Sequence, residues 1–535
     1  MEAKYVLAYD IGTTGVKTCL FRIDSVITLL ESASMGYHLY TLPDGGAEQD
    51  ADEWWDAMAQ TTKKLFAGSS VKPEDIAGIS FCSQMQGVVV VDRDGNALRR
   101  PMSYMDQRAK KEVKEGISNG IQVASANIFK LIPYLMITGA VSSSVKDPIW
   151  KYKWIENNEP EIFSKIYKVF DVKDYLICRC TGEFKCTQDS AFGFLLYDTR
   201  KGKEGWSKRI CDMVGFHMEH LPEIVQSTDM IGRLTEKAAA ELGLAAGTPV
   251  FGGGGDASLI GVGAGAVGVG ETHIYSGTSG WVCTVVDKQM VDTGAMIAAI
   301  VGAQPGKFNY FAEMETASKC FEWVKEHLAE DEIDLYLDKH DITESRENYE
   351  STYTNLYEFL NRVVADVPAG SNGVIFTPWL HGNRCPFEDP NAAGIFFNIK
   401  VDTGKSDMIR AVLEGICFHL RWMYERELKK AASVGPVRFV GGGTLSPVTS
   451  QMLADILGTE VETVASPQNV GSVGAAAVIG VGIGLINSLD DVKSFIPADR
   501  KYTPNPDHKA TYDKNFEVFK KMYSTNKKLF AELNG

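Results

Sequence analysis

The sequence contains no hydrophobic run long enough to cross a membrane and no excess of positive charge. The glycine-rich apolar stretch at residues 260–270 falls short of the roughly 18 residues that a membrane span needs. Lys and Arg number 54 against 69 Asp and Glu, which gives a formal net charge of -15. Nucleic acid and anionic membranes repel such a protein, so neither is expected as a partner, and an anionic ligand would need a local positive site.

Cysteine is present but lacks the spacing of a metal centre. The ten cysteines include no CxxC pair, and Cys178-Arg179-Cys180 is a poor metal-binding spacing. Most of the others stand singly in apolar runs, which is typical of reduced, buried thiols. The N-terminus also lacks the charged, apolar and small-residue pattern of a secretory signal. We therefore expect a soluble, cytoplasmic protein.

The length predicts two domains. A chain of 535 residues exceeds what one hydrophobic core supports, and 44% hydrophobic with 23% charged residues is ordinary for a globular protein. The strongest internal break is "TPVFGGGGDASLIGVGAGAV", where a strand runs into four glycines and Asp256. The boundary is placed there, which divides the chain into residues 1–256 and 257–535.

The stretch "YVLAYDIGTTGVKTCLF", starting at Tyr5, resembles a phosphate loop without matching either common type. In a P-loop counted from Gly12, the second glycine would stand at position 17, which is Lys17. A dinucleotide loop opens a helix, whereas the residues after Gly15 are rich in β-branched and aromatic types. The pattern therefore predicts a β-hairpin whose tip offers hydroxyls and free N–H groups to a polyphosphate.

Nearly the same phrase returns as "YSGTSGWVCTVV" from Tyr275. One such loop would be an ordinary glycine turn. Two near-copies, one in each half of the chain, favour a pair of phosphate-binding hairpins built on repeated units.

Several other elements are expected from local signals. Asp50 and Glu53 form a capping-box pattern for a helix that ends near Gly68. Asp94-Gly95 predicts a hairpin turn, residues 110–174 are mostly helical in pattern, and residues 317–366 have the composition of a charged, solvated helical surface. Residues 437–440 predict a strand, followed by a glycine loop at 441–443. A helix then follows with Ser446 as N-cap, Pro447 at the first position and Gly458 at its end. A buried helical stripe is formed by Ile409, Val412, Leu413, Ile416, Leu420 and Met423.

Together these pieces resemble the FGGY carbohydrate kinases over nearly the whole chain, most closely the xylulokinase-like branch. The matching motifs, in family order, are "DIGTTGVK", "EQDADEWW", "SQMQG", "YMDQR", "GGGGDA", "SGTSGW", "PWLHGNRCPFEDPNAAG", "RAVLEGICFHL" and "GGGTLSPVTSQMLADILG". The resemblance implies an α/β fold of two actin-like (ribonuclease H-like) domains, with ATP and sugar bound in the interdomain cleft. The repeated hairpin then reflects two copies of one ancestral unit.

The resemblance also assigns roles in phosphoryl transfer. Asp256 is implied to be the general base for the sugar hydroxyl, and Asp10 to position Mg²⁺ through waters. The alternative for Asp256 is a loop-capping aspartate, and for Lys17 a solvated strand lysine. The implied ATP contacts are Gly12, Thr13, Thr14, Lys17, Gly277 and Thr278 on the phosphates, and Gly442, Gly443 and Ser446 on the adenosine side, with Gln451 a weaker candidate.

The implied sugar contacts are Gln84, Met85, Gln86, Asp106 and Asp256. Xylulokinases carry histidine at the position of Gln86 and asparagine at that of Ala257, so this chain departs from them at two sugar contacts. Asp106 and Arg108 follow the W-x-D-x-R pattern with Tyr104 in place of tryptophan. The alternative for Asp106 is an ion pair with Arg108 that holds the loop. Trp54 and Trp55 are interpreted as helix core.

The resulting hypothesis is an ATP- and Mg²⁺-dependent kinase for a small-molecule sugar, with a pentulose such as D-xylulose as the leading substrate. Another ketose, a polyol or a sugar acid is the alternative within the class. An actin-like, ATP-dependent interaction module is the alternative from another class, and a dehydrogenase is disfavoured because the strand-loop-helix fingerprint is missing. A homodimer is compatible with the sequence.

Overall fold

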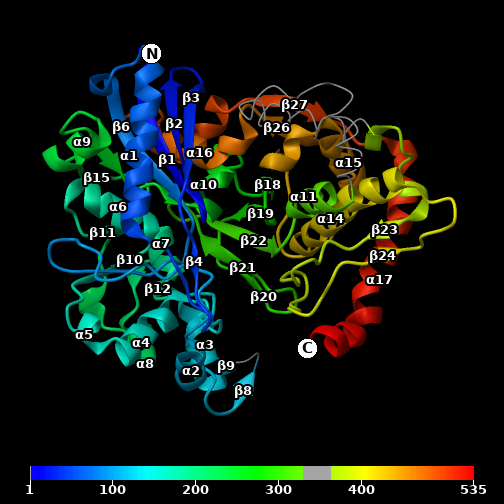
Figure 1. Cartoon of the computed structure of the whole chain (residues 1–535), viewed down its shortest axis with the longest axis horizontal. Coiled ribbons are helices and arrows are strands. Elements are labelled where there is room, and N and C mark those ends of the chain that lie inside the picture. Colours follow the sequence, from blue (N-terminus) through cyan, green and yellow to red (C-terminus); the bar gives the residue numbers. More distant parts are fainter. Residues whose placement is uncertain (1, 124–125, 329–362) are drawn as a thin grey trace.

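The structure is a computed structural model that describes residues 2–123, 126–328 and 363–535. Figure 1 shows two α/β halves side by side, the N-terminal half in blue to green and the C-terminal half in green to red. Each half is built on one large sheet with helices packed against it.

The first sheet has the order β15-β16-β6-β1-β2-β3, with β17 also pairing with β6. Strands β1, β2 and β3 are antiparallel neighbours, whereas β6 runs parallel to β1. Its strands are β1 (Lys4–Ile11), β2 (Gly15–Ile23), β3 (Ile27–Gly36), β6 (Ile76–Ser83), β15 (Met230–Arg233), β16 (Pro249–Phe251) and β17 (Gly254–Gly255).

The second sheet repeats this plan in the order β20-β21-β22-β19-β18-β25-β26-β27. Strands β18, β19 and β22 are antiparallel neighbours, and β25 runs parallel to β18 just as β6 does to β1. Its strands are β18 (Thr272–Ser276), β19 (Gly280–Val286), β20 (Val291–Asp292), β21 (Ile297–Val301), β22 (Phe308–Met314), β25 (Val437–Val440), β26 (Val461–Val464) and β27 (Ala498–Tyr502). The repeated topology agrees with the expected pair of related units.

The helices repeat as well. Helix α1 (Ala51–Gly68) connects the third strand of the first meander to β6, and α14 (Lys405–Glu427) connects β22 to β25. Helix α10 (Asp256–Gly263) follows β17, helix α16 (Val470–Gly482) follows β26, and the two helices pack against each other. A Cβ at Gly474 would lie 2.3 Å from the carbonyl oxygen of Leu259, so the two backbones are in direct contact.

The remaining elements extend both units. Those of the N-terminal half are β4 (Tyr40–Thr41), β5 (Ala47–Glu48), β7 (Val89–Val91), α2 (Lys110–Gly116), β8 (Gln122–Val123), β9 (Ala126–Asn127), α3 (Ile128–Ile137), α4 (Pro148–Asn158), α5 (Pro160–Phe163), β10 (Lys168–Phe170), α6 (Val172–Thr181), β11 (Lys185–Thr187), α7 (Gln188–Gly193), β12 (Tyr197–Asp198), β13 (Gly205–Trp206), α8 (Lys208–Val214), β14 (Glu223–Val225) and α9 (Glu236–Leu242). Those of the C-terminal half are α11 (Lys319–His327), β23 (Ile375–Phe376), β24 (Phe396–Phe397), α15 (Pro447–Leu457) and α17 (Lys509–Asn534).

A large hydrophobic core joins the two halves. It includes Val6 and Phe21 of the first sheet, Leu259 of α10, Val478 of α16 and Cys283 of the second sheet. Two other large clusters lie within one half each. The fourth lies in the N-terminal half but also includes Val301 of β21. The junction between the halves is therefore an apolar contact centred on α10 and α16.

Most local predictions are confirmed. Asp50 caps α1 by accepting the N–H of Asp52 at 2.9 Å, but the capping box is wrong. Glu53 instead accepts hydrogen bonds from the N–H of His38 at 2.8 Å and from the Tyr40 hydroxyl, so its carboxylate is bound to the segment before the helix.

The predictions for the C-terminal half are also confirmed for α15 and α14. Ser446 accepts the N–H of Thr449 at 3.1 Å, and α15 ends at Gly458 with φ of 69°. The predicted stripe of α14 is buried throughout, as are Trp54 and Trp55. Of the charged segment 317–366, α11 covers 319–327, and residues 329–362 lie outside the described residues.

All ten cysteines are free and buried. Among the described helices, none combines the length and the apolar character that a membrane crossing requires.

Candidate active site

The first predicted phosphate hairpin is the turn between β1 and β2. The Gly12 N–H donates to the Gly15 carbonyl at 2.9 Å and closes the turn. A Cβ at Gly15 would lie 2.8 Å from the Met35 carbonyl oxygen, so glycine is required here by the close approach of β3. Thr13 is half-buried and Thr14 is exposed at the tip.

Lys17 has a role that neither sequence interpretation included. It stands opposite Asp10 in the β1–β2 register, and its Nζ donates to the carbonyl of Gln468 at 2.8 Å. Gln468 lies two residues before the start of α16 at Val470, so this bond links the first hairpin to the C-terminal half. Contact between Lys17 and a phosphate remains a prediction, and the ammonium has further donors with which to make it besides the one bound to Gln468.

The second hairpin, between β18 and β19, has the same form. The Gly277 N–H donates to the Ser279 carbonyl at 2.9 Å, and Thr278 is exposed at the tip. Since β25 pairs in parallel with β18, the following glycine loop lies beside this tip: a Cβ at Gly443 would be 2.9 Å from the Ser276 side chain. A Cβ at Gly442 would meet nothing within 4 Å, which leaves an open backbone surface for a flat ligand.

Two residues expected on the adenosine side, Ser446 and the weaker candidate Gln451, have partners within the protein. The Ser446 hydroxyl caps α15, and the Gln451 amide donates to Asp455 at 2.7 Å and to the Thr503 carbonyl at 2.8 Å. Both side chains therefore have structural roles, and their contact with ATP remains a prediction.

Asp256 is the first residue of α10, not the last residue of a strand leading into a loop. The short β17 ends at Gly255, and the Asp256 carboxylate accepts the N–H of Ala257 at 2.7 Å. Burial is the main cause that raises the pKa of Asp256 to about 7, and the carboxylates of Asp10 and Glu313 raise it further. The hydrogen bond from the Ala257 N–H acts in the opposite direction and lowers this pKa. A half-buried carboxylate with such a pKa is suited to accept a proton near neutral pH.

Asp10 lies close to Asp256 and to the start of α16. A Cβ at Gly471 would be 3.2 Å from the Asp10 carboxylate, so the first turn of α16 reaches it from the other half. Burial raises the pKa of Asp10, and Lys17 opposes the rise. The partial positive charge of a helix N-terminus also favours an ionised carboxylate at this position.

The loop at residues 83–87 connects these carboxylates to the first hairpin. Gln84 donates through its amide to Gln49 at 2.9 Å, and Gln49 donates to the Thr13 carbonyl at 2.6 Å. Met85 packs against the strand that precedes Asp256, since a Cβ at Gly255 would lie 2.2 Å from its Cγ. The Gln86 amide group makes no side-chain hydrogen bond to the described part of the chain, so it is available to a ligand.

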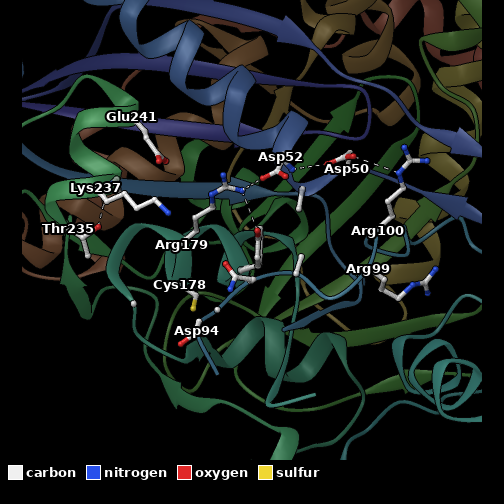
Figure 2. A pocket seen from close by; sticks show the side chains of 17 residues that line it. Asp50, Asp52, Asp94, Arg99, Arg100, Cys178, Arg179, Thr235, Lys237 and Glu241 are labelled. Atoms are coloured by element: carbon white, nitrogen blue, oxygen red, sulfur yellow. Dashed lines mark hydrogen bonds and ion pairs between the residues drawn. The ribbon is translucent and has the colours of Figure 1, made fainter. Parts of the chain in front are cut away.

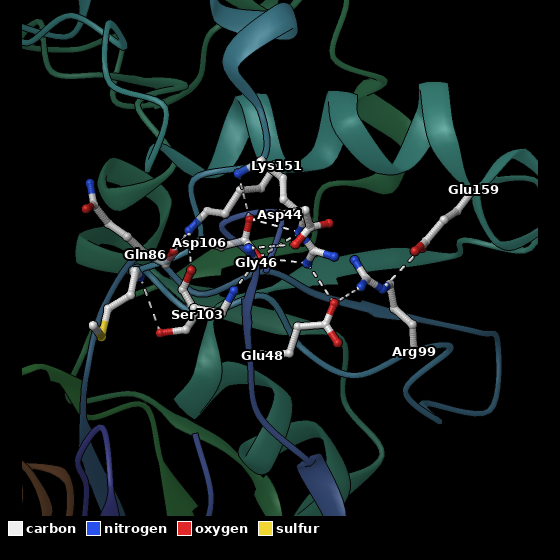
Figure 3. Close-up of polar contacts among 12 residues, drawn as sticks. Asp44, Gly46, Glu48, Gln86, Arg99, Ser103, Asp106, Lys151 and Glu159 are labelled. Atoms are coloured by element: carbon white, nitrogen blue, oxygen red, sulfur yellow. Dashed lines mark hydrogen bonds and ion pairs between the residues drawn. The ribbon is translucent and has the colours of Figure 1, made fainter. Parts of the chain in front are cut away.

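For Asp106 the structure favours the alternative of a loop-holding ion pair. Its carboxylate is 0% exposed and accepts bonds from the Ala47 N–H at 2.9 Å and the Arg108 guanidinium at 2.7 Å. Arg108 also binds Glu48 at 2.6 Å, within the buried cluster of Figure 3. A direct sugar contact of Asp106 remains a prediction.

Comparison with known proteins decides the family. The family model described as "FGGY family of carbohydrate kinases, N-terminal domain" matches residues 5–263, and the corresponding C-terminal domain model matches residues 273–483. The chain belongs to the FGGY family of carbohydrate kinases.

Relatives of the kinase match along its whole length. The xylulose kinase of Bacillus subtilis (strain 168) is 28% identical over 532 residues, covering 99% of both chains. The gluconokinase of the same organism is 27% identical and covers 96% of this chain and 94% of the relative. A ligand-bound xylulose kinase structure from Lactobacillus acidophilus has a TM-score of 0.83 at 27% identity over 99% of both chains, and a gluconate kinase structure from that organism has 0.81 at 27% over 98%. The two-domain kinase fold is thus shared.

The residues present fit the cofactors of the family, whose sugar kinases use ATP, generally with Mg²⁺. No group of three His, Cys, Asp or Glu side chains suited to a metal occurs among the described residues. Mg²⁺ usually takes one or two carboxylates and completes its shell with phosphate oxygens and water, and Asp10 supplies such a carboxylate. Bound there, the ion would neutralise phosphate charge beside the two hairpin tips.

The structure adds residues that the sequence interpretation did not assign to the site. Glu313, near the end of β22, raises the pKa of Asp256 and forms an ion pair with Arg384 at 2.7 Å. Tyr104 lies beside the first hairpin, with its hydroxyl 3.5 Å from the Thr13 hydroxyl. Arg384 lies in the family motif "HGNRCPFEDP", and this motif could have indicated that it belongs to the site. No local sequence pattern indicated that Glu313 does.

A separate pocket lies away from this site on the N-terminal half (Figure 2). It has a volume of about 440 Å³ and is lined by α1, α6, α9 and residues 94–100. Its Arg179 is bound to Asp52 at 2.6 Å and its Arg100 lies 3.7 Å from Asp50. None of the predicted site residues lines it, so it does not belong to the candidate active site.

Proposed function

We propose that this kinase transfers the γ-phosphoryl group of ATP, with Mg²⁺, to a hydroxyl of a ketose, and that a pentulose such as D-xylulose is the leading substrate. The observation that carries the proposal is Asp256. Its half-buried carboxylate has a pKa raised to about 7, mainly by burial and further by Asp10, and it follows Gly255, which packs against Met85 of the loop at residues 83–87. Full-length relatives named xylulose kinase support the choice of sugar.

The charges around the loop support a neutral acceptor over a sugar acid. Lys151 is bound to the Gln86 and Ser103 carbonyls, Arg108 to Asp106 and Glu48, and Arg384 to Glu313. A buried carboxylate of a sugar acid would need a cation of its own to offset its loss of hydration. Relatives named gluconokinase keep the sugar acid as the alternative to be tested.

The test is ATP turnover in the presence of Mg²⁺ with a panel of ketoses, polyols and sugar acids. We expect a ketose to give the highest kcat/KM and gluconate to give little turnover. Turnover that no panel member raises, but that peptides do raise, would instead support an actin-like interaction module. Location in the cytoplasm is part of the same proposal, and the ten free, buried thiols support it.

A further inference from the structure

The loop at residues 83–87 contains a residue in a disfavoured conformation. Gln86 has φ of 63°, in the left-handed region that residues other than glycine avoid unless their surroundings hold them there. Its N–H donates to one oxygen of Asp171 at 2.8 Å, and the Gly87 N–H donates to the other at 2.9 Å. One carboxylate therefore holds both amides of the turn.

Lys151 holds the opposite side of the same peptide. It lies on α4, is 0% exposed, and donates from Nζ to the Gln86 carbonyl at 2.6 Å and to the Ser103 carbonyl at 3.0 Å. Figure 3 shows its side chain reaching toward both. Ser103 begins the segment that contains Asp106, so one ammonium group connects the two segments predicted to bind the sugar.

The charges around Lys151 explain how a lysine is accommodated there. Burial lowers the pKa of Lys151 to about 8, while the carboxylates of Asp106, Asp171 and Asp147 oppose that change. These three carboxylates come from the Ser103–Arg108 segment and from the N-termini of α6 and α4. A buried ammonium is unfavourable unless hydrogen bonds and opposite charges compensate its loss of hydration. Here two of its three donors are bonded to carbonyls, and three carboxylates favour its charge.

We infer that Lys151 is a positioning residue for the acceptor, which fixes the Gln86 turn and its spacing from the segment containing Asp106. The inference rests on the proposed function, because that function assigns these two segments to the sugar. Lys151 makes no bond to either phosphate hairpin, so its influence is on acceptor affinity and selectivity and not on ATP binding.

The test is the Lys151→Met variant, with Lys153→Met as the matched control. Lys153 lies on the same helix and is bound to Glu156 and, at 3.2 Å, to the Gly215 carbonyl, away from both segments. Steady-state kinetics use the panel sugar that the native kinase turns over best. We expect Lys151→Met to raise the KM for that sugar by about 10- to 100-fold. The KM for ATP should stay within about twofold, and Lys153→Met should change neither constant.

Hydrogen exchange of peptides covering residues 84–87 gives a readout that does not depend on activity. Exchange should be faster in Lys151→Met than in the native protein and in Lys153→Met. An unchanged sugar KM, or an equal rise in both KM values, would overturn the inference. If Lys151→Met does not fold, Asp171→Asn serves as the second variant, because it retains one of the two acceptor oxygens that hold the turn. It should raise the KM for the sugar and leave the KM for ATP unchanged. An unchanged KM for the sugar in this variant would then overturn the inference. If the native protein phosphorylates no panel sugar, the proposed function fails while exchange still decides whether Lys151 holds the turn.

Discussion

At the scale of single residues, the proposed catalytic role of Asp256 requires a charge that its buried position disfavours. As the proposed base, its carboxylate must be ionised to accept a proton from the sugar, yet burial and the carboxylates of Asp10 and Glu313 oppose ionisation. Replacing Asp256 with asparagine removes the base and keeps the shape. We expect kcat to fall by about 10²–10⁴-fold.

ATP binding in Asp256→Asn, measured by calorimetry with a non-hydrolysable analogue, should remain close to native. Asp212→Asn, on the exposed surface of α8, is the control and should keep native turnover. Near-native kcat in Asp256→Asn would show that another group is the base.

The pKa of Asp256 also predicts a pH dependence. With a pKa of about 7, the carboxylate loses its ability to accept a proton as the pH falls through that value, so kcat should decline below about pH 7. Because the folded-state pKa lies above the ordinary value of 3.8, the folded protein binds this proton more tightly than the unfolded chain does, and stability decreases as the pH rises between these values. Asp256→Asn should therefore have a higher Tm than the native protein at pH 8, and the difference should shrink toward pH 5. Equal Tm differences at both pH values would contradict the assignment.

Gln86 and Ala257 carry the prediction about specificity. The Gln86 amide is free of side-chain bonds to the described residues, and Ala257 adds no polar group next to Asp256. A site that bonds a hydroxyl rejects analogues lacking it, whereas an apolar gap tolerates extra bulk. We predict that the native kinase accepts at least one related ketose or polyol comparably to D-xylulose.

The double variant Gln86→His with Ala257→Asn should shift the kcat/KM ratio toward D-xylulose. The measurement is kcat/KM for each sugar of the panel with native and double-variant enzyme. A native preference for D-xylulose of more than about 10²-fold over every other member would refute this prediction.

At the scale of secondary structure, the close contact between α10 and α16 leaves no room for a side chain at Gly474. Glycine in a helix interior is less favourable than alanine by about 1 kcal/mol, so propensity alone predicts that Gly474→Ala stabilises α16. The added Cβ would lie 2.3 Å from the Leu259 carbonyl, however, and a backbone atom cannot move aside easily. Overpacking of a core typically destabilises by about 1–3 kcal/mol, so the packing effect should win.

We therefore expect a lower Tm for Gly474→Ala in calorimetry. Gly68→Ala is the matched control, because Gly68 ends α1 and a Cβ there meets nothing within 4 Å. It should leave Tm unchanged or slightly raised. A native Tm for Gly474→Ala would contradict this prediction, because it would mean that α10 and α16 can move apart with little loss of stability.

Elements with strong local signals were predictable from sequence. The two hairpins follow from glycine turns between β-branched runs, and α15 follows from Ser446, Pro447 and Gly458. Helix α10 was not predicted, because "GGGGDASLIGVG" is rich in weak helix formers. It is helical because α16 packs against it, and that partner lies about 200 residues away in the chain.

At the scale of the whole molecule, the residues predicted to bind ATP come from both halves. Tyr275, which leads into the second hairpin, has its pKa raised by burial and by the carboxylates of Asp10 and Asp256, and Lys17 of the first hairpin binds Gln468 of the C-terminal half. If both hairpins grip one ATP, the halves should close on it. X-ray scattering should show a smaller radius of gyration with the sugar and a non-hydrolysable ATP analogue together than for the free protein. The analogue alone and the sugar alone serve as controls, and an unchanged profile in all three mixtures would argue against closure.

The sequence by itself determined the duplicated hairpins, the caps, the buried stripe of α14 and the family motifs, because these depend on residues within one or two turns of each other. Only the tertiary structure decided that Lys17 binds Gln468, that Asp106 is occupied by Arg108, and that Lys151 and Asp171 hold Gln86. These contacts join segments whose proximity is set by the packing of sheets and helices. The pKa of Asp256 likewise depends on burial and on carboxylates from distant strands, which no local pattern encodes.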